Sequence, residues 1–384
     1  MLKQPVYIQS CASISALGKT PSEIWDNYIH SKALFQEEKF GEKKYWISKI
    51  SKENEADLNA IIQSDTKYKF LDRSVILAIL VARNALKGTN FKSNEIGINF
   101  GSSRGATTLF EKYHEEFLNN NQISTYTSPS TTLGNISSWV SHDLQSTGPE
   151  ISHSITCSTG LHALLNGIAW LQSGMATFFL VGASEAPLTS FSLAQLTALK
   201  VYSNEQNSYP CRALDFEKEA NTMVLGEAAT CLSISLEKEN AIAKILGIGY
   251  ATEILSSAAS ISTDALCFQK SMKMAIEGYN LDEIDAIIMH APGTIQGDLS
   301  EFEAIKKVFG KHTPLLTTNK WKTGHTFATS GLLNIEMAIL MMENQQFIES
   351  PFYENKNNTR KLNKILVNAV GFGGNAVSVL ISKK

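Results

Sequence analysis

The feature that most constrains the fold is a strand–turn–helix pattern that occurs once in each half of the chain. In the N-terminal half, an apolar strand within 94–105 ends in a Gly/Ser turn, and a later small-residue turn opens an amphipathic helix expected over 161–171. In the C-terminal half, a buried strand within 281–290 ends in another small-residue turn, and a polar turn precedes a helix expected over 332–342. Two similar halves of alternating strands and helices predict a duplicated α/β architecture.

The rest of the chain completes these halves, which we divide as 1–240 and 241–384. The length of 384 residues and the hydrophobic content of 43% allow a large buried core and argue against disorder. Residues 35–68 are polar with weak periodicity and predict surface structure, whereas 203–227 is expected to be mostly loop. Further strands are expected at 6–10, 177–185, 228–236, 242–248 and 376–381, and further helices over 71–86, from Asn135, and from Pro21 with Thr20 as its N-cap.

Charge and cysteine usage exclude several classes of protein. The net charge is −3 and no basic block is present, so nucleic acid is an unfavourable partner. The five cysteines are scattered without paired spacing, which is typical of a reducing compartment rather than of a disulfide framework or a zinc site. Since no segment reaches the roughly 18 apolar residues of a membrane span and the N-terminus lacks the apolar stretch of a signal peptide, we expect a cytoplasmic protein.

Cys157 lies in the turn at or just before the start of the 161–171 helix. A helix N-terminus presents unpaired N–H groups and a partial positive charge, which favour a thiolate and lower the thiol pKa. Cys157 is therefore a candidate nucleophile, while the alternative from the turn alone is a buried cysteine that acts as a small hydrophobic residue.

The C-terminal half supplies the other candidate residues. His290 stands at the end of a strand, where open α/β sheets place ligands, and His325 follows a glycine before the 332–342 helix. Taken singly, each histidine could equally be structural. An isolated lysine such as Lys320 is usually a solvated surface charge. Phe372 lies between Gly371 and Gly373, which free the backbone so that an N–H can point at an oxyanion. Together with Cys157, these residues indicate an acyl-transfer site of the Cys-His type.

Another turn, 101–105, admits a weak phosphate-binding interpretation, but it lacks a full Gly-rich fingerprint. Tight strand-to-helix packing is the favoured interpretation of that turn.

Four motifs resemble those of the β-ketoacyl-acyl-carrier-protein synthases, which are condensing enzymes of the thiolase superfamily. In chain order they are Cys157-Ser158-Thr159-Gly160, the segment from His290 to Glu301, the segment from Thr318 to His325 with Lys320 inside it, and Gly371-Phe372-Gly373-Gly374. Their order is that of the family, and the similarity spans nearly the whole chain.

The resemblance implies a thiolase fold, which has five layers (α-β-α-β-α) built from two related halves. It also implies decarboxylative Claisen condensation, in which Cys157 accepts an acyl group and a malonyl-carrier thioester loses CO₂ to attack it. His290 and His325 would donate hydrogen bonds to the thioester oxygen, and Lys320 would position and polarise the surroundings of His325. Backbone N–H groups of Cys157 and Phe372 would bind the second oxyanion.

The resemblance extends to the substrate arm and the partners. Thr294 is expected to help hold the phosphopantetheine arm, Gly374 is expected to bind substrate, and Phe372 is expected to gate the acyl pocket. The implied partners are acyl carrier protein and a second subunit, either an identical chain or a chain-length-factor-like one. Neither a metal nor a redox cofactor is expected.

Departures from the family pattern affect substrate and carrier preference more than the chemistry. Ala291 and Pro292 replace a Gly-Thr pair, Asn334 stands where a glutamate is usual with Glu336 two positions later, and Asn375 replaces a threonine. Three alternatives remain: a non-catalytic chain-length-factor-like subunit, a CoA-dependent thiolase-like enzyme, and a lipid-binding module. The second lacks the C-terminal catalytic cysteine of a thiolase, since no cysteine follows Cys267.

Overall fold

The computed structural model describes residues 2–89, 96–133, 135–254, 261–356 and 361–384. Ten strands form one hydrogen-bonded sheet in the order β11-β10-β12-β13-β9-β1-β8-β6-β4-β5. The N-terminal strands are β1 (Val6–Ile14), β4 (Gly97–Gly101), β5 (Glu150–His153), β6 (Phe178–Glu185) and β8 (Ala228–Ser235). The C-terminal strands are β9 (Ala243–Thr252), β10 (Ala286–Ile288), β11 (Leu315–Thr317), β12 (Lys364–Gly371) and β13 (Asn375–Lys383).

The two five-stranded halves of this sheet have the same pairing pattern. In the N-terminal half, β5, β4 and β6 pair in parallel, whereas β8 and β1 follow antiparallel. In the C-terminal half, β11, β10 and β12 pair in parallel, whereas β13 and β9 follow antiparallel. The halves join where Val6 to Ile8 of β1 pairs with β9. The predicted duplication is therefore confirmed, and β1 connects its two copies.

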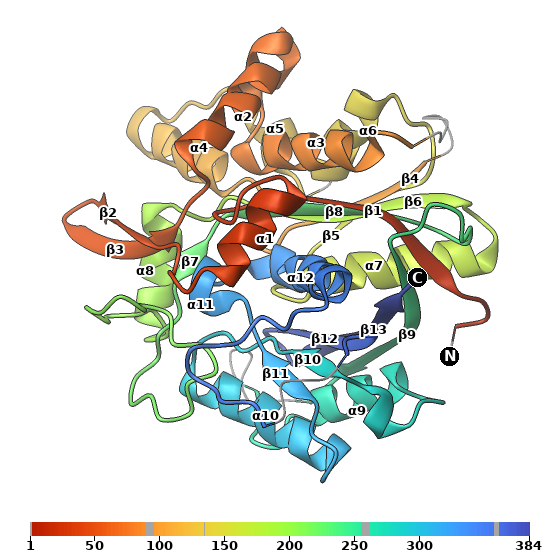
Figure 1. Ribbon diagram of the computed structural model, residues 1–384. Helices are drawn as coiled ribbons and strands as arrows, with labels where there is room; N and C mark the ends of the chain where they lie inside the picture. Colours follow the sequence, from red (N-terminus) through yellow and green to blue (C-terminus); the bar gives the residue numbers. More distant parts are fainter. Residues whose placement is uncertain (1, 90–95, 134, 255–260, 357–360) are drawn as a thin grey trace.

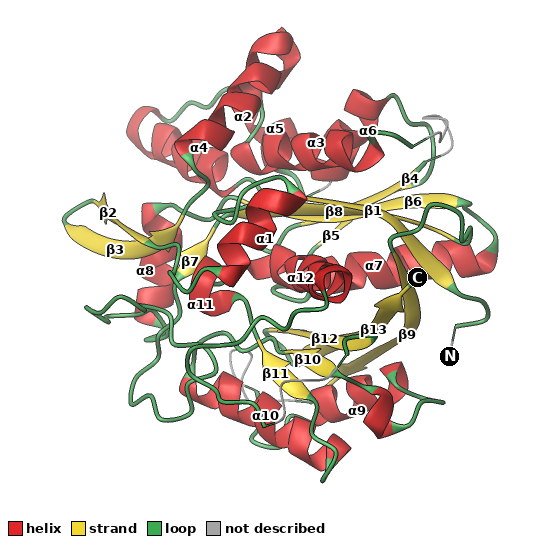
Figure 2. Cartoon of the chain, viewed as in Figure 1, coloured by secondary structure: helices red, strands yellow, loops and turns green. Residues whose placement is uncertain are grey.

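Helices divide the molecule into five layers (Figures 1 and 2). The central layer contains α7 (Thr159–Ser173) and α12 (Ser330–Asn344), which pack together in the largest hydrophobic cluster. One outer layer includes α3 (Arg73–Leu86) and α6 (Asn135–Leu144), and the other includes α9 (Leu266–Ala275) and α10 (Ile295–Phe309). The expected thiolase fold is confirmed. Because α12 lies between sheet halves, it is apolar on nearly every face and is buried along almost its whole length.

The remaining elements lie mainly at the periphery. Residues 35–68 form β2 (Gln36–Phe40), β3 (Lys43–Ser48), α2 (Lys52–Ser64) and a short 3₁₀ turn. The expectation of surface structure holds for most of this region, but its regular elements were missed. The strand β2 is polar and mostly exposed, and β3 is buried only at its end, so neither shows apolar alternation. The two-residue strand β7 (Leu225–Gly226) pairs with β3 inside the expected loop region. The other helices are α1 (Pro21–Ile29), α4 (Thr107–Asn120), α5 (Thr127–Thr131), α8 (Ser190–Ala198) and α11 (Lys320–Thr323).

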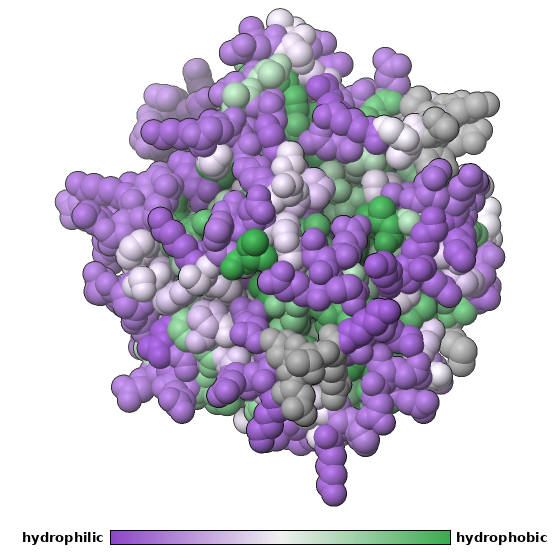
Figure 3. All heavy atoms as spheres, viewed as in Figure 1, coloured by the Kyte–Doolittle hydropathy of each residue, from purple (hydrophilic) through white to green (hydrophobic). Residues whose placement is uncertain are grey.

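Several local expectations are also confirmed. Thr20 caps α1 by accepting from the Glu23 N–H at 3.3 Å. The strand predicted within 94–105 is β4, while Asn94 and Glu95 lie outside the described residues. The face drawn in Figure 3 is mostly hydrophilic, with apolar side chains in small scattered groups. Within the described ranges, no helix combines the length and apolar character needed to cross a bilayer.

Candidate active site

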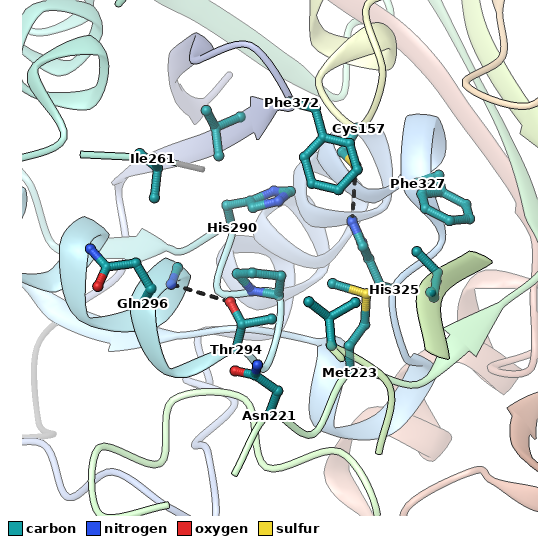
Figure 4. Close-up of a pocket in the computed structure, with 16 residues that line it drawn as sticks. Cys157, Asn221, Met223, Ile261, His290, Thr294, Gln296, His325, Phe327 and Phe372 are labelled. Carbon is teal, nitrogen blue, oxygen red and sulfur yellow. Dashed lines mark hydrogen bonds between the residues drawn. The ribbon is translucent and has the colours of Figure 1, made fainter. Parts of the chain in front are cut away.

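A cavity of about 230 Å³ collects side chains from both halves of the fold (Figure 4). Cys157, from the turn between β5 and α7, lies beside His325, from the turn before α12. His290 follows β10, and Phe372 follows β12. The further lining residues are Leu196, Val201, Asn221, Met223, Ile261, Pro292, Thr294, Gln296, Gly297, Phe327, Val370 and Gly371. The structure thus brings the sequence-predicted residues Cys157, His290, His325 and Phe372 together.

The turn that carries Cys157 is held by Thr159, the first residue of α7. Its hydroxyl accepts from the Ile155 N–H at 2.8 Å and donates to the Thr156 carbonyl at 2.6 Å. Thr156 has a φ of +46°, an unfavourable value for a β-branched residue, which these bonds stabilise. At Gly160, the residue after Thr159, the two halves pack closely. A Cβ added there would lie 2.5 Å from the Ala328 carbonyl oxygen.

His325 is fixed on both sides of its ring. Its Nε2 lies 3.1 Å from Cys157 Sγ, and its Nδ1 lies 3.1 Å from the Ser330 hydroxyl. Gly324 precedes it with a φ of +66°, a conformation suited to glycine, and a Cβ there would meet the Val224 carbonyl oxygen at 2.6 Å. Burial, followed by the charge of Lys320, lowers the pKa of His325 well below its usual value. The imidazole is therefore neutral beside the thiol.

His290 is positioned through its backbone. Its N–H donates to Glu301 Oε1 at 3.0 Å, and the N–H of Ala291 donates to Glu301 Oε2 at 2.9 Å. The ring lies at right angles to that of His325, with 5.2 Å between centroids. Burial, then the charge of Lys320, lowers the His290 pKa well below its usual value. Two neutral imidazoles therefore face the same cavity, and Glu301 holds one of them in place.

Lys320 is fully buried at the start of α11, so the solvated-charge interpretation was wrong. Its predicted role was to position and polarise the surroundings of His325, and its ammonium donates to the backbone carbonyl of His290. Burial lowers the pKa of Lys320 to about 8, and the nearby carboxylate of Glu301 partly opposes this shift. Its field acts on both histidines, since its charge lowers the pKa of each.

The structure contradicts the expected direction of the Cys157 pKa. Burial, and after it the charge of the Glu185 carboxylate, raises the pKa of this thiol to about 12. The positive charges of Lys320 and Arg104 oppose this rise without overcoming it. Cys157 also lies two residues before the first residue of α7, outside the turn in which the helix dipole acts most strongly. The thiol is therefore neutral at rest.

The glycine turn after β12 packs directly against the cysteine turn. A Cβ on Gly371 would lie 2.0 Å from Thr156 Oγ1, so glycine is required for this close approach. The approach places Phe372 beside Cys157, with 39% of its surface exposed (Figure 4). Gly373 and Gly374 have φ values of +88° and +70° and shape the turn, but the described cavity lining includes neither. The expected contact of Gly374 with substrate has no support in this geometry.

Thr294 lines the cavity and caps α10, where its hydroxyl oxygen accepts from the Gly297 N–H at 3.2 Å. The hydroxyl hydrogen remains able to donate to a ligand. Asn221 and Gln296 add polar groups on this side of the cavity. Sequence reasoning assigned neither residue to the site: Asn221 belongs to none of the four motifs, and Gln296 lies within the His290–Glu301 motif but was given no role.

The departures from the family pattern have separate structural roles. Asn334 is buried and its amide donates to the Met289 carbonyl at 3.4 Å, next to His290. Glu336 instead accepts from Ser13 on β1 at 2.7 Å, so it does not replace a carboxylate beside Lys320. Asn375 accepts from the Thr252 hydroxyl at 2.9 Å, and neither residue belongs to the described cavity lining.

Comparison with known proteins agrees with this arrangement. Residues 3–240 match the family model "Beta-ketoacyl synthase, N-terminal domain", and residues 242–353 match "Beta-ketoacyl synthase, C-terminal domain". The chain is 24% identical to 3-oxoacyl-[acyl-carrier-protein] synthase 2 of Coxiella burnetii, over 100% of this chain and 99% of that protein. It is 27% identical to the enzyme of the same name from Staphylococcus aureus, with 82% of each chain covered.

Solved ketosynthases share the fold at lower sequence identity. A chain of the type II polyketide complex AntDE:AntF, a ketosynthase with its acyl-carrier protein, matches with a TM-score of 0.86 and 17% identity, over 99% of this chain and 100% of that one. The ishigamide ketosynthase/chain length factor matches with a TM-score of 0.87 and 16% identity, over 99% of both chains.

Proposed function

The chain belongs to the β-ketoacyl synthase family, and we propose that Cys157, His290 and His325 carry its carbon–carbon bond-forming acyl transfer. The reaction is a decarboxylative Claisen condensation of an acyl thioester with a malonyl-carrier thioester, which lengthens the acyl chain by two carbons. The observation that carries the residue assignment is the 3.1 Å separation between Cys157 Sγ and His325 Nε2, in a cavity that also contains His290.

The first step loads the acyl group. Because the thiol is neutral at rest, His325 Nε2 accepts its proton as the sulfur attacks the thioester carbonyl. The carrier thiolate leaves and takes that proton, so His325 returns to the neutral state. Ser330 suits this cycle because its hydroxyl can accept from or donate to Nδ1, according to the tautomer.

The second step forms the carbon–carbon bond. The malonyl thioester loses CO₂, and the carbonyl oxygen that becomes the enolate accepts a hydrogen bond from the Nε2–H of His290. His325 donates a second one after a change of tautomer, in which its proton moves to Nε2 and Ser330 becomes the donor to Nδ1. The enolate carbon attacks the acyl carbonyl on Cys157, and the bond to sulfur breaks to return the thiolate, which takes a proton from solvent. Backbone N–H groups of Cys157 and Phe372 would bind the intermediate oxyanion.

Lys320 and Thr294 have supporting roles in this proposal. Lys320 keeps both imidazoles neutral and orients His290 through its carbonyl, while Thr294, with the polar groups near it, would hold the phosphopantetheine arm. The steps transfer acyl groups and protons and release CO₂, with no net oxidation or reduction, so the proposed reaction calls for neither a redox cofactor nor a metal.

We propose acyl carrier protein as the substrate partner and a dimer as the working assembly. Similarity to ketosynthases solved with an acyl-carrier protein or with a chain length factor supports both. β5 is the last strand of the sheet, so its outer edge is available for a second subunit, either identical or chain-length-factor-like. The alternative of a non-catalytic partner subunit is disfavoured because the nucleophile and both histidines share one cavity.

The experiment is product analysis with acyl and malonyl carrier proteins. A ketoacyl product two carbons longer than the acyl donor is expected from the native chain and not from Cys157→Ala. Product from Cys157→Ala at the native rate would contradict the assignment. Activity that appears only with an added ketosynthase subunit, and survives Cys157→Ala, would establish the partner-subunit role instead.

A further inference from the structure

The cavity has two chemically different sides. Asn221, Thr294 and Gln296 give one side its hydrogen-bonding groups, and Figure 4 shows Gln296 across the Cys157–His325 pair from Phe327. On the other side, Cys157, Leu196 and Phe327 belong to one buried apolar cluster. The polar side suits the amide-rich arm of the carrier, which leaves the apolar side for the acyl chain on sulfur.

Phe327 closes the apolar side. The residue is 2% exposed, and its ring centroid lies 5.2 Å from that of His325. Its backbone φ is +45°, an uncommon value for a bulky residue that persists only where the surroundings hold it. The ring is therefore held in place by its surroundings and does not lie free in the cavity.

A positive charge lies against this ring. The Arg104 guanidinium carbon is 5.0 Å from the Phe327 ring centroid, and its Nη1 donates to the side-chain oxygen of Gln195 on α8. Within the described part of the chain, no carboxylate forms an ion pair with Arg104, although other arginines have such partners. Stacking on an aromatic face and a planar hydrogen bond are contacts that guanidinium makes better than ammonium.

Arg104 places a charged group, instead of an apolar one, behind the ring of Phe327. A chain that pushed the ring aside would place methylene groups against a guanidinium that forms no ion pair among the described residues, and would strip it of water. Burying a charge without a partner is unfavourable, whereas an aliphatic residue at this position would extend the apolar surface. The ring and the charge therefore form one wall, which we call the Arg104–Phe327 wall.

We propose that the Arg104–Phe327 wall ends the acyl side of the cavity and restricts this synthase to short acyl groups. The inference rests on the proposed function, because it assigns the substrate range of that same site. Arg104 acts in it as a specificity-determining residue and takes no part in the bond-forming steps.

The test measures the rate at which Cys157 is acylated, by intact-mass spectrometry, from carriers that bear acetyl, hexanoyl or decanoyl groups. The native protein is expected to accept acetyl at least about tenfold faster than decanoyl, since a few methylenes that do not fit discriminate by one to two decades. Arg104→Met, which keeps the length of the side chain and removes the charge, is expected to reduce this ratio to about threefold or less, with acetyl transfer changed little.

Two controls separate the charge from a general structural effect. Arg104→Lys keeps the charge and should keep the discrimination against decanoyl. Arg83→Met removes another arginine, on α3, whose guanidinium carbon lies 5.9 Å from the centroid of the Tyr68 ring, and should leave the ratio unchanged.

Equal rates with acetyl and decanoyl in the native protein would overturn the inference, as would an unchanged ratio in a folded Arg104→Met that accepts acetyl. Faster transfer from an oxygenated chain than from an alkyl chain of equal length, lost in Arg104→Met, would also overturn it, because Arg104 would then bind substrate directly. Failure of every carrier to acylate Cys157 would overturn the proposed function itself.

Discussion

The two halves of the molecule share a topology but contribute different chemistry. The turn before α7 in the N-terminal half carries Cys157, and the equivalent turn before α12 carries His325. The end of β10 leads to His290, whereas the equivalent end of β4 leads to Ser102. One half thus provides the nucleophile, and the other provides the two imidazoles and the buried lysine. Duplication of a fold can supply equivalent positions without fixing the residues that occupy them.

The comparison of the two halves also explains why the Cys157 thiol is protonated at rest. Considered within its own half, Cys157 precedes a helix and would be expected to ionise easily. Residues of both halves cover it, among them Leu196 and Met223 from the N-terminal half and Phe327 from the C-terminal half. The resulting loss of water raises its pKa to about 12. The chemistry of the nucleophile therefore depends in part on the packing of one half against the other, and the predictions below test this dependence in order of decreasing effect.

The largest effect is expected from removing the nucleophile. Cys157→Ala should lose the acyl adduct and the condensation product completely, because no second nucleophile lines the described part of the cavity. Mass spectrometry and circular dichroism would establish the loss and the intact fold. Cys231→Ala, at a buried cysteine on β8, is the matched control and should still form the adduct. An adduct on another residue of Cys157→Ala would contradict the assignment.

Removing each histidine should separate the two steps. His290→Ala should load acyl groups normally but condense about 10²–10³-fold more slowly, since loss of one oxyanion donor costs about 3 kcal/mol. His325→Ala should slow both steps, because this residue alone contacts the sulfur among the described hydrogen bonds. Single-turnover measurements of loading and of condensation give the two rates. If both variants slowed loading equally, the assignment of loading to His325 alone would be contradicted.

The thiol should resist alkylation at neutral pH. Since burial raises the folded-state pKa from 9.0 to about 12, the neutral thiol is favoured throughout the usual range. The rate of iodoacetamide alkylation of Cys157 should therefore rise about tenfold per pH unit from pH 7 to 10 without a plateau. The unfolded protein should instead reach its plateau near or just above its ordinary pKa. A plateau near pH 7 in the folded protein would support the lowered pKa that the helix position predicts.

The smallest effects are expected from glycine substitutions at packing contacts. Gly160→Ala places a methyl group against Ala328 of the other half, whereas Gly167→Ala places one 2.5 Å from Val181 of the same half. Each should reduce the free energy of unfolding by about 1–3 kcal/mol, as overpacking does. Only Gly160→Ala should also slow acylation, because it shifts Cys157 relative to His325. Urea unfolding and loading rates test both statements, and equal loading by both variants would contradict the second.

The sequence predicted the framework and the main site residues because both leave local signals. Period and capping located β1, β4, β6, β8, β9, β10 and β13 of the large sheet and the helices α1, α3, α6, α7 and α12, including Thr20 as an N-cap, but not α4, α8, α9 or α10. The ordered motifs indicated Cys157, His290 and His325. Hydrogen bonds and burial that link the halves leave no such signal. The raised Cys157 pKa and the position of Arg104 against Phe327 depend on packing between residues that are distant in the sequence. The lysine contact with the His290 carbonyl lies within one half, but it joins residues 30 positions apart and also leaves no local pattern.

The measurement that tests the central claim most directly follows an acyl group through the site. The native protein is loaded from an acyl carrier, the adduct is located on Cys157 by peptide mass spectrometry, and malonyl carrier is then added. We predict that the adduct disappears as a ketoacyl product two carbons longer forms, and that it persists in His290→Ala for about 10²–10³-fold longer. Formation of the product while the Cys157 adduct remains, or a loaded group on any other residue, would contradict the account.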